Sequence, residues 1–187
     1  MKAIMKKRFG LMLVACTLAI SLAAEAQQTC RSESEIPSST PSSRFSDHGN
    51  GTVTDTRSGL MWAKCAVGKT GTTCASGAAA RYTWKGALDF AEVSSHAGYP
   101  DWRLPDVKEL ASIVEQRCVN PAINQDPAVF PNTPASFFWS SSPWTATVSS
   151  AWTVYFYYGS SGYALRDKDV VGRDLGIHVR LVRDAGQ

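Results

Sequence analysis

The sequence lacks the local signatures of most catalytic and metal sites. It contains no Gly-x-Ser-x-Gly element, no phosphate-binding loop, no His-Glu-x-x-His motif and no dinucleotide-binding glycine motif. It has no Cys-x-x-Cys pair, and its three histidines (His48, His96 and His178) are far apart in the chain, which argues against a zinc site and against thiol redox catalysis. We therefore expect no enzyme activity and no cofactor.

The chain also lacks a charge surplus once its first segment is set aside. Its 19 basic and 16 acidic side chains give a formal charge of +3, but four of the basic residues fall within the first eight positions. Removal of residues 1–26 takes away these four and Glu25, which leaves 15 side chains of each sign. Nucleic-acid binding requires positive charge to neutralise phosphates, so we expect no nucleic-acid partner.

Residues 1–26 have the three parts of a secretory signal peptide. A basic stretch is followed by an uncharged, mostly apolar run over 9–24 and then by Ala24-Glu25-Ala26, a small-x-small cleavage pattern. This run is shorter than the ~20 apolar residues of a spanning helix. We therefore expect cleavage after residue 26, no membrane span in the mature chain, and a secreted or periplasmic protein. The alternatives are a retained membrane helix and a lipoprotein anchored at Cys16, which ends a lipobox-like sequence.

Four cysteines remain after the signal segment: Cys30, Cys65, Cys74 and Cys118. An even number fits disulfide formation in an oxidising compartment, and four cysteines allow three pairings. Cys65 and Cys74 flank a turn-rich stretch and can close a local loop. In that case Cys30 and Cys118 would join the N-terminal segment to the rest of the domain.

Composition divides the mature chain into a linker and one domain. Seven of the sixteen residues over 31–46 are serine and two are proline. Such a stretch cannot bury enough surface to order itself, so we expect a flexible Ser/Pro-rich linker over 27–46. The domain should cover 47–183, which is long enough for one ordinary core, with a short tail over 184–187.

Hydrophobic periodicity predicts two helices between groups of strands. Apolar residues over 84–91 recur with helical spacing after the N-cap residue Thr83, and Gly98 is expected to end this helix. A second helix should start where Asp106 and Glu109 form a capping-box pair. Strands are expected over 52–56, 60–64, 137–142, 151–158, 163–165 and 177–181. This order indicates an α+β domain with two helices packed on mainly antiparallel strands.

Five short motifs occur in order along the domain. They are Gly-Thr-Val-Thr-Asp-Thr at 51–56, Gly-Leu-Met-Trp at 59–62, Asp-Trp-Arg-Leu-Pro at 101–105 with Glu-Leu at 109–110, Phe-Trp-Ser-Ser-Ser at 138–142, and Val-Arg-Leu-Val-Arg at 179–183. Together they resemble the Lcl C-terminal domain family. The resemblance implies a C-type-lectin-like fold and, through a family member at the tip of a bacterial collagen-like adhesin, binding of sulfated glycosaminoglycans. This chain has no Gly-x-y repeat, hence no collagen stalk, and its neutral mature charge argues against strong polyanion binding.

Most of the motif residues are expected to be structural. The motif tryptophans Trp62, Trp102 and Trp139 should anchor the core, and Arg103 should form an ion pair or stack on an aromatic ring.

Ligand contacts are expected from other aromatic residues. Trp144 lies in a Ser/Thr-rich connection and can stack on a sugar ring. Tyr155 and Tyr157 share one face of a predicted strand, and their hydroxyl groups suit a solvent-exposed surface.

Charged residues near the C-terminus give a third set of candidates. Arg166, Lys168 and Arg173 could bind the anionic groups of a sulfated glycan, although internal ion pairs are the alternative. The interleaved aspartates (Asp167, Asp169 and Asp174) are an alternative calcium site, but Ca²⁺ needs ~6–8 oxygen ligands and basic residues adjoin them, so we expect no metal.

These observations predict an exported, non-catalytic binding module that recognises a glycan, a sulfated polysaccharide or another surface polymer in the manner of an adhesin. The alternative is an interaction or structural module of the bacterial envelope, in which the aromatic strand faces a partner protein.

Overall fold

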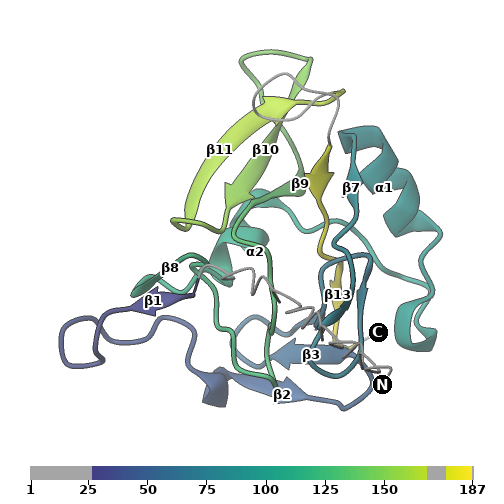
Figure 1. Cartoon of the computed structure of the whole chain (residues 1–187). Helices are drawn as coiled ribbons and strands as arrows, with labels where there is room; N and C mark the ends of the chain where they lie inside the picture. Colours follow the sequence, from purple (N-terminus) through teal and green to yellow (C-terminus); the bar gives the residue numbers. More distant parts are fainter. Residues whose placement is uncertain (1–26, 168–175, 187) are drawn as a thin grey trace, which may run out of the picture.

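The computed structural model describes residues 27–167 and 176–186. The predicted signal peptide with Cys16 lies outside the described residues, as do Lys168 and Arg173. The described part is an α+β domain with two α-helices and mainly antiparallel strands in several sheets, which confirms the predicted fold class (Figure 1). Its C-type-lectin-like arrangement stays a prediction.

A four-stranded antiparallel sheet, in the order β13-β4-β3-β2, forms one part of the domain (Figure 1). Its strands are β2 (Phe45–Asp47), β3 (Thr52–Asp55), β4 (Leu60–Ala63) and β13 (Val182–Asp184). A hairpin joins β3 to β4. Gly59 closes its turn with φ of 72°, a conformation that glycine adopts without steric cost.

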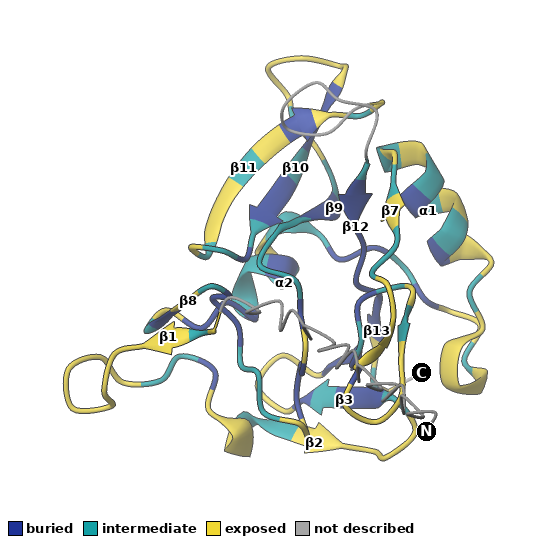
Figure 2. Ribbon diagram, in the orientation of Figure 1, coloured by how far each residue is buried: buried dark blue, intermediate teal, exposed yellow. Residues whose placement is uncertain are grey.

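A five-stranded sheet, in the order β11-β10-β9-β12-β7, contains Tyr155 of the predicted aromatic residues, whereas Trp144 follows β9 and Tyr157 follows β10. Its strands are β7 (Arg81–Tyr82), β9 (Phe137–Pro143), β10 (Ser150–Tyr155), β11 (Ser160–Leu165) and β12 (Ile177–His178). Strand β12 pairs with β9 in parallel, and the other pairs are antiparallel. The edge strand β11 is largely exposed whereas its neighbour β10 is largely buried, as Figure 2 shows.

The two helices, α1 (Trp84–Glu92) and α2 (Val107–Ser112), pack on opposite faces of the five-stranded sheet. Successive residues of a strand point to opposite faces. On β9, Phe138 belongs to the core cluster that contains Leu110 of α2, and Trp139 belongs to the cluster that contains Ala87 of α1. The α2 cluster also contains Trp62, so it joins the five-stranded sheet to the four-stranded sheet.

Both helices begin at the predicted caps. The Thr83 hydroxyl accepts a hydrogen bond of 3.2 Å from the backbone N–H of Gly86. The Asp106 carboxylate accepts from the backbone N–H of Glu109 at 2.8 Å, and the Glu109 carboxylate accepts from the backbone N–H of Asp106 at 2.7 Å. The predicted capping box is therefore formed, because its two partners are local in the sequence.

Several predicted element boundaries are wrong. The strand expected over 151–158 ends at Tyr155, so Tyr157 does not lie on it, and β11 begins at Ser160 rather than at Tyr163. Helix α1 ends at Glu92 and is followed by a separate 3₁₀ segment, η2 (His96–Gly98), so Gly98 does not end the helix. The single strand expected over 177–181 is divided between β12 and β13, which belong to different sheets. The chain passes from one sheet to the other here, so His178 and Arg180 are buried like the apolar residues between which they lie. The alternation of polar and apolar residues over 177–181 therefore does not indicate a solvent-exposed face.

Residues 27–46 pack against the domain, contrary to the predicted flexible linker. Strand β1 (Thr29–Cys30) pairs with β8 (Cys118–Val119), and β2 forms the edge of the four-stranded sheet. Between them, the 3₁₀ segment η1 (Ser42–Arg44) brings the Arg44 guanidinium to Asp55, with Nε donating to Oδ1 at 2.7 Å. The segment thus contributes two strand pairings and an ion pair to the fold.

Glu115 provides the physical reason for this order. Its carboxylate is buried and accepts hydrogen bonds from the Ser38 hydroxyl at 2.6 Å, the Ser39 backbone N–H at 3.1 Å, and the Thr40 N–H and hydroxyl at 3.0 and 2.8 Å. Burial on its own would raise the pKa of the Glu115 carboxyl, but these hydrogen bonds outweigh it and lower the pKa to about 2. The serine-rich segment is ordered because a buried anion binds its hydroxyls and amides, which composition does not reveal.

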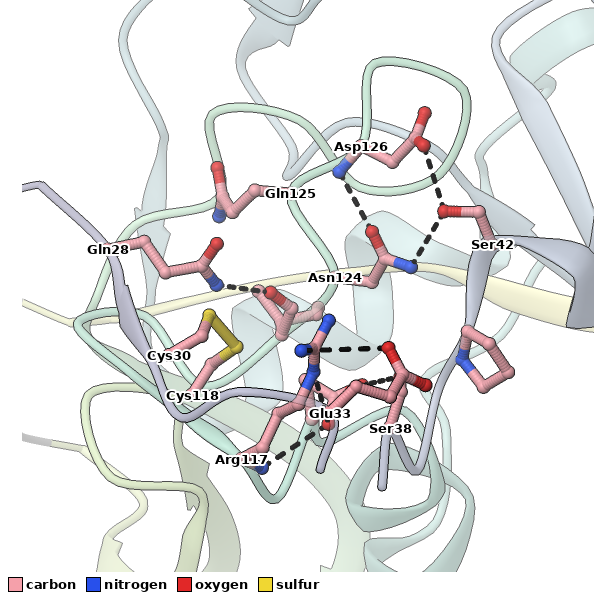
Figure 3. Close-up of a pocket in the computed structure, with 13 residues that line it drawn as sticks. Gln28, Cys30, Glu33, Ser38, Ser42, Arg117, Cys118, Asn124, Gln125 and Asp126 are labelled. Atoms are coloured by element: carbon pink, nitrogen blue, oxygen red, sulfur yellow. Dashed lines mark hydrogen bonds and ion pairs between the residues drawn. A yellow bond between two sulfur atoms is a disulfide. The ribbon is translucent and has the colours of Figure 1, made fainter. Parts of the chain in front are cut away.

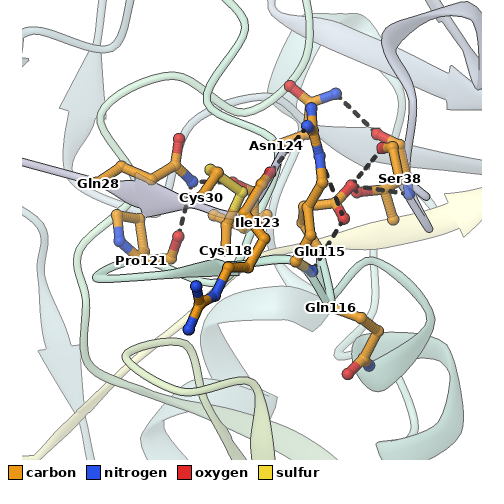
Figure 4. The surroundings of a disulfide bond; sticks show 12 residues. Gln28, Cys30, Ser38, Glu115, Gln116, Cys118, Pro121, Ile123 and Asn124 are labelled. Carbon is orange, nitrogen blue, oxygen red and sulfur yellow. Dashed lines mark hydrogen bonds and ion pairs between the residues drawn. A yellow bond between two sulfur atoms is a disulfide. The ribbon is translucent and has the colours of Figure 1, made fainter. Parts of the chain in front are cut away.

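Two disulfides, Cys30–Cys118 and Cys65–Cys74, connect the four cysteines of the described chain. The first joins β1 to β8, where the two residues are direct partners (Figure 4). The second adjoins the short pair formed by β5 (Lys69–Thr70) and β6 (Ser76–Gly77). Both bonds fit an exported protein in an oxidising compartment. Across residues 27–167 and 176–186, no helix has the length and apolar character to cross a membrane.

Candidate functional site

Four of the charged motif residues form two ion pairs. Arg103 donates from Nη1 and Nη2 to the two Glu109 oxygens at 2.7 and 2.8 Å, a bidentate pair that is partly exposed. Arg183 donates from Nε to Asp101 at 2.7 Å. Burial would raise the pKa of Glu109, but the hydrogen bonds from Arg103 and the Asp106 backbone lower it. Carboxylates held in this way stabilise the fold and are poorly suited to transfer protons.

The motif tryptophans are core anchors, as predicted. Trp62, Trp102 and Trp139 are buried. The indole N–H of Trp139 donates to the Tyr82 carbonyl at 2.9 Å, and that of Trp102 donates to the His96 carbonyl at 2.9 Å. The faces of these rings pack inside the domain and are not available to a ligand.

Arg180 is a structural cation. It is fully buried and donates to the carbonyl of Ala63 at 2.8 Å and to the hydroxyl of Thr133 at 2.6 Å. Its guanidinium carbon lies 4.7 Å from the centre of the Phe130 ring. Burial lowers the pKa of Arg180 to about 9, so the side chain stays charged at neutral pH. It joins three segments of the chain and contributes nothing to a basic surface.

Trp144 lies flat against Tyr163 of the edge strand β11. The ring centroids are 3.6 Å apart and the ring planes differ by 9°. Tyr163 is 51% exposed and Trp144 is half-buried. The backbone N–H of Trp144 donates to the Ser150 carbonyl at 3.1 Å, which ties its connection to the start of β10. We refer to Trp144 and Tyr163 as the Trp144 platform.

Tyr155 and Tyr157 belong to a second aromatic group, the tyrosine cluster, which also contains Phe137 and Tyr158. Tyr155 stacks on Phe137 with centroids 4.1 Å apart, and Tyr157 lies 5.8 Å from Tyr155 and 4.4 Å from Tyr158. Tyr158 is 65% exposed. Burial, and then the neighbouring Tyr158 and Tyr157, raise the pKa of the Tyr155 hydroxyl.

The two aromatic groups lie on opposite faces of the sheet. Directly paired residues on antiparallel strands share a face, and Tyr163 pairs with Trp152 whereas Tyr155 pairs with Phe137. Trp152 and Tyr155 are three positions apart on β10, so their side chains point to different faces. The structure therefore does not bring Trp144 together with Tyr155 and Tyr157.

The described part of the basic cluster is engaged internally. The Arg166 guanidinium lies 4.2 Å from the centre of the Trp84 ring, and its Nε donates to the Ser150 carbonyl at 3.0 Å. Lys168, Arg173 and two of the three aspartates of the alternative calcium site lie outside the described residues. Among the residues that are described, no group of three His, Cys, Asp or Glu side chains could hold a metal ion.

A polar pocket of about 490 Å³ opens beside the Cys30–Cys118 disulfide (Figure 3). Its walls come from two segments, 28–42 and 115–126. Its lining includes Gln28, Pro41, Arg117, Ile123, Gln125 and Asp126 together with the disulfide. Sequence reasoning missed this pocket because it treated the first segment as a linker. The even cysteine count was the one sequence feature that indicated a disulfide between the two segments.

The chain matches the model of the Lcl C-terminal domain over residues 51–183, which confirms the resemblance drawn from the five motifs. Comparison with curated proteins and with solved structures finds no match. The matched range contains both motif ion pairs, the three anchoring tryptophans and both aromatic groups. The chain therefore belongs to the Lcl C-terminal domain family.

Proposed function

We propose that this protein is an exported, non-catalytic module that binds a glycan or another surface polymer on the Trp144 platform. The observation that carries the proposal is the parallel stack of Trp144 on Tyr163 at the exposed edge of the five-stranded sheet. A ring held in place by stacking loses little conformational entropy when a ligand binds. A flat aromatic surface of this kind suits the apolar face of a sugar ring.

Among the described residues, the charge distribution favours stacking over ion pairing as the main source of affinity. Arg166 is engaged with Trp84, and Arg180 and Arg183 are buried. A neutral or weakly charged saccharide fits these surroundings better than a sulfated polysaccharide does. Binding of a sulfated polymer should then depend only weakly on salt, because screening affects charge contacts far more than stacking.

The ion pairs of the motif residues support a non-catalytic role. Glu109 is bound by Arg103 and Asp101 by Arg183, and these two ion pairs account for the charged positions of the Asp-Trp-Arg-Leu-Pro motif and of the Glu-Leu that follows it. The two disulfides support export, and secretion or a periplasmic location follows from the predicted cleavage site. Anchoring through Cys16 remains the alternative form of export.

The tyrosine cluster favours a second candidate function, the binding of an envelope protein. Aromatic residues are enriched at protein interfaces, and Tyr158 presents most of its surface to solvent. The backbone of the cluster is fixed, since the Tyr157 carbonyl accepts from the Asn120 N–H at 2.8 Å. A partner protein would use this face, whereas a glycan would use the opposite one.

A glycan and polysaccharide array tests the proposal. The full chain, purified in its oxidised form, is probed at low and at physiological salt, with calcium and with a chelator. We expect binding that persists at physiological salt. Trp144→Ala should weaken it about two- to tenfold, because stacking on an aromatic ring contributes about 0.5–1.5 kcal/mol beyond the buried area. Val148→Ala is the matched control, since Val148 lies in the same connection and is 89% exposed.

Equal binding by wild type and Trp144→Ala would contradict the platform as the site. An array without any binding, together with co-purification of an envelope protein that Tyr157→Ala abolishes, would support the second candidate. Binding that requires calcium would indicate a metal-dependent site.

A further inference from the structure

We infer that the polar pocket is a separate binding site for one neutral sugar residue or a polyol of similar size. The inference does not depend on the Trp144 platform. The pocket volume of about 490 Å³ falls within the range of roughly 300–1,000 Å³ found for small-molecule sites.

The two walls of the pocket are fixed in place. The Cys30–Cys118 disulfide joins them at one side (Figure 4). Glu115 binds Ser38 and Thr40 on the opposite wall, and the Asn124 amide donates to the Thr40 carbonyl at 2.7 Å. A pocket whose walls are joined by a covalent bond and by hydrogen bonds is organised before a ligand arrives, so little ordering entropy opposes binding.

The pocket offers both acceptors and donors. The Gln28 side-chain N–H₂ donates to the carbonyls of Pro121 and Ile123, both at 2.7 Å, which leaves its amide oxygen as an acceptor (Figure 3). The Nε of Arg117 is buried and lies 4.0 Å from a carboxylate oxygen of Glu115, and its Nη1 donates to the Arg31 carbonyl at 3.2 Å. The remaining guanidinium N–H groups of Arg117 can donate to a ligand oxygen. Hydroxyl groups suit this mixture because each can donate and accept.

Charge favours a neutral ligand over an anion. Three carboxylates line the pocket, from Glu33, Glu115 and Asp126, against the single guanidinium of Arg117. The Asp126 carboxylate already accepts from the Ser42 hydroxyl and the Ala128 N–H, both at 2.8 Å. A sulfate or carboxylate would meet a negative surplus here. The disulfide, Pro41 and Ile123 provide an apolar wall for the C–H face of a sugar ring.

The test is an NMR titration of the full, oxidised, isotope-labelled chain. The probes are glucose, galactose, mannose, N-acetylglucosamine and myo-inositol, each titrated into the millimolar range. We expect at least one probe to produce saturable shifts at the Arg117 Nε–H and at the Gln125 side-chain amide. Loss of one hydrogen bond in Gln125→Ala should raise the Kd about two- to tenfold. The matched control is Gln116→Ala, since Gln116 is exposed and does not line this pocket.

Arg117→Lys is the second variant. It keeps the charge but removes the guanidinium N–H donors, and it should weaken the same probe. The inference is overturned if no probe causes saturable shifts at these two groups, or if Gln125→Ala and Gln116→Ala bind equally well. The pocket and the platform are distinguished by Trp144→Ala, which should leave the shifts at Arg117 and Gln125 unchanged.

Discussion

Glu115 is the residue on which the order of the N-terminal segment most depends. It is buried and accepts hydrogen bonds from Ser38, Ser39 and Thr40. Local sequence could not identify this role, because the acceptor and its donors are 75 to 77 residues apart. By contrast, the roles of Trp62, Trp102 and Trp139 could be predicted, since large aromatic residues within apolar strand or loop motifs are most often buried.

Glu115→Gln should lower the free energy of unfolding by about 2–3 kcal/mol, because a charged acceptor of several hydrogen bonds is replaced by a neutral group with its own donors. Urea denaturation measures the change. Glu92→Gln is the matched control: it makes the same chemical change at an exposed position and should stay within about 0.5 kcal/mol of wild type. Similar losses in the two variants would contradict the role of Glu115.

The same carboxylate predicts a pH dependence. The pKa of Glu115 is about 2 in the folded chain, below its ordinary value of 4.5. Its ionised form therefore contributes stability that is fully present above 4.5 and is lost as the pH falls from 4.5 towards 2. The difference in unfolding free energy between wild type and Glu115→Gln should shrink over this interval. A difference that stays constant with pH would show that the folded pKa is not lowered.

At the scale of elements, prediction succeeded where the partners are local. The caps Thr83 and Asp106 mark the starts of α1 and α2 because each contacts a backbone N–H three residues away. The end of α1 and the division of 177–181 between two sheets depend on tertiary packing, which periodicity does not contain. The packing of residues 27–46 was missed for the same reason.

The two disulfides should contribute unequally to the free energy of unfolding. Cys30–Cys118 spans 88 residues and Cys65–Cys74 spans nine. Cross-linking the longer loop removes more entropy from the unfolded chain, so its loss should cost roughly 4–5 kcal/mol against about 2.5 kcal/mol for the shorter loop. Urea denaturation of the two double Cys→Ser variants measures both values. A larger loss from the Cys65/Cys74 variant would contradict this assignment.

At the scale of the whole molecule, the aromatic candidates are divided between two faces. Sequence analysis identified Trp144, Tyr155 and Tyr157 as surface aromatics, and all three are half-exposed. It could not separate them, because strand register decides which residues share a face. Nor could it find Tyr163 as the stacking partner of Trp144, since the whole of β10 lies between these two residues in the chain.

The most direct test of the proposed function is an NMR titration of tryptophan indole N–H groups with the glycan that binds best on the array. The account predicts a saturable shift of the Trp144 indole, while the buried indoles of Trp62 and Trp139 stay unchanged. Saturable shifts confined to the tyrosine cluster, with the Trp144 indole unaffected, would contradict it.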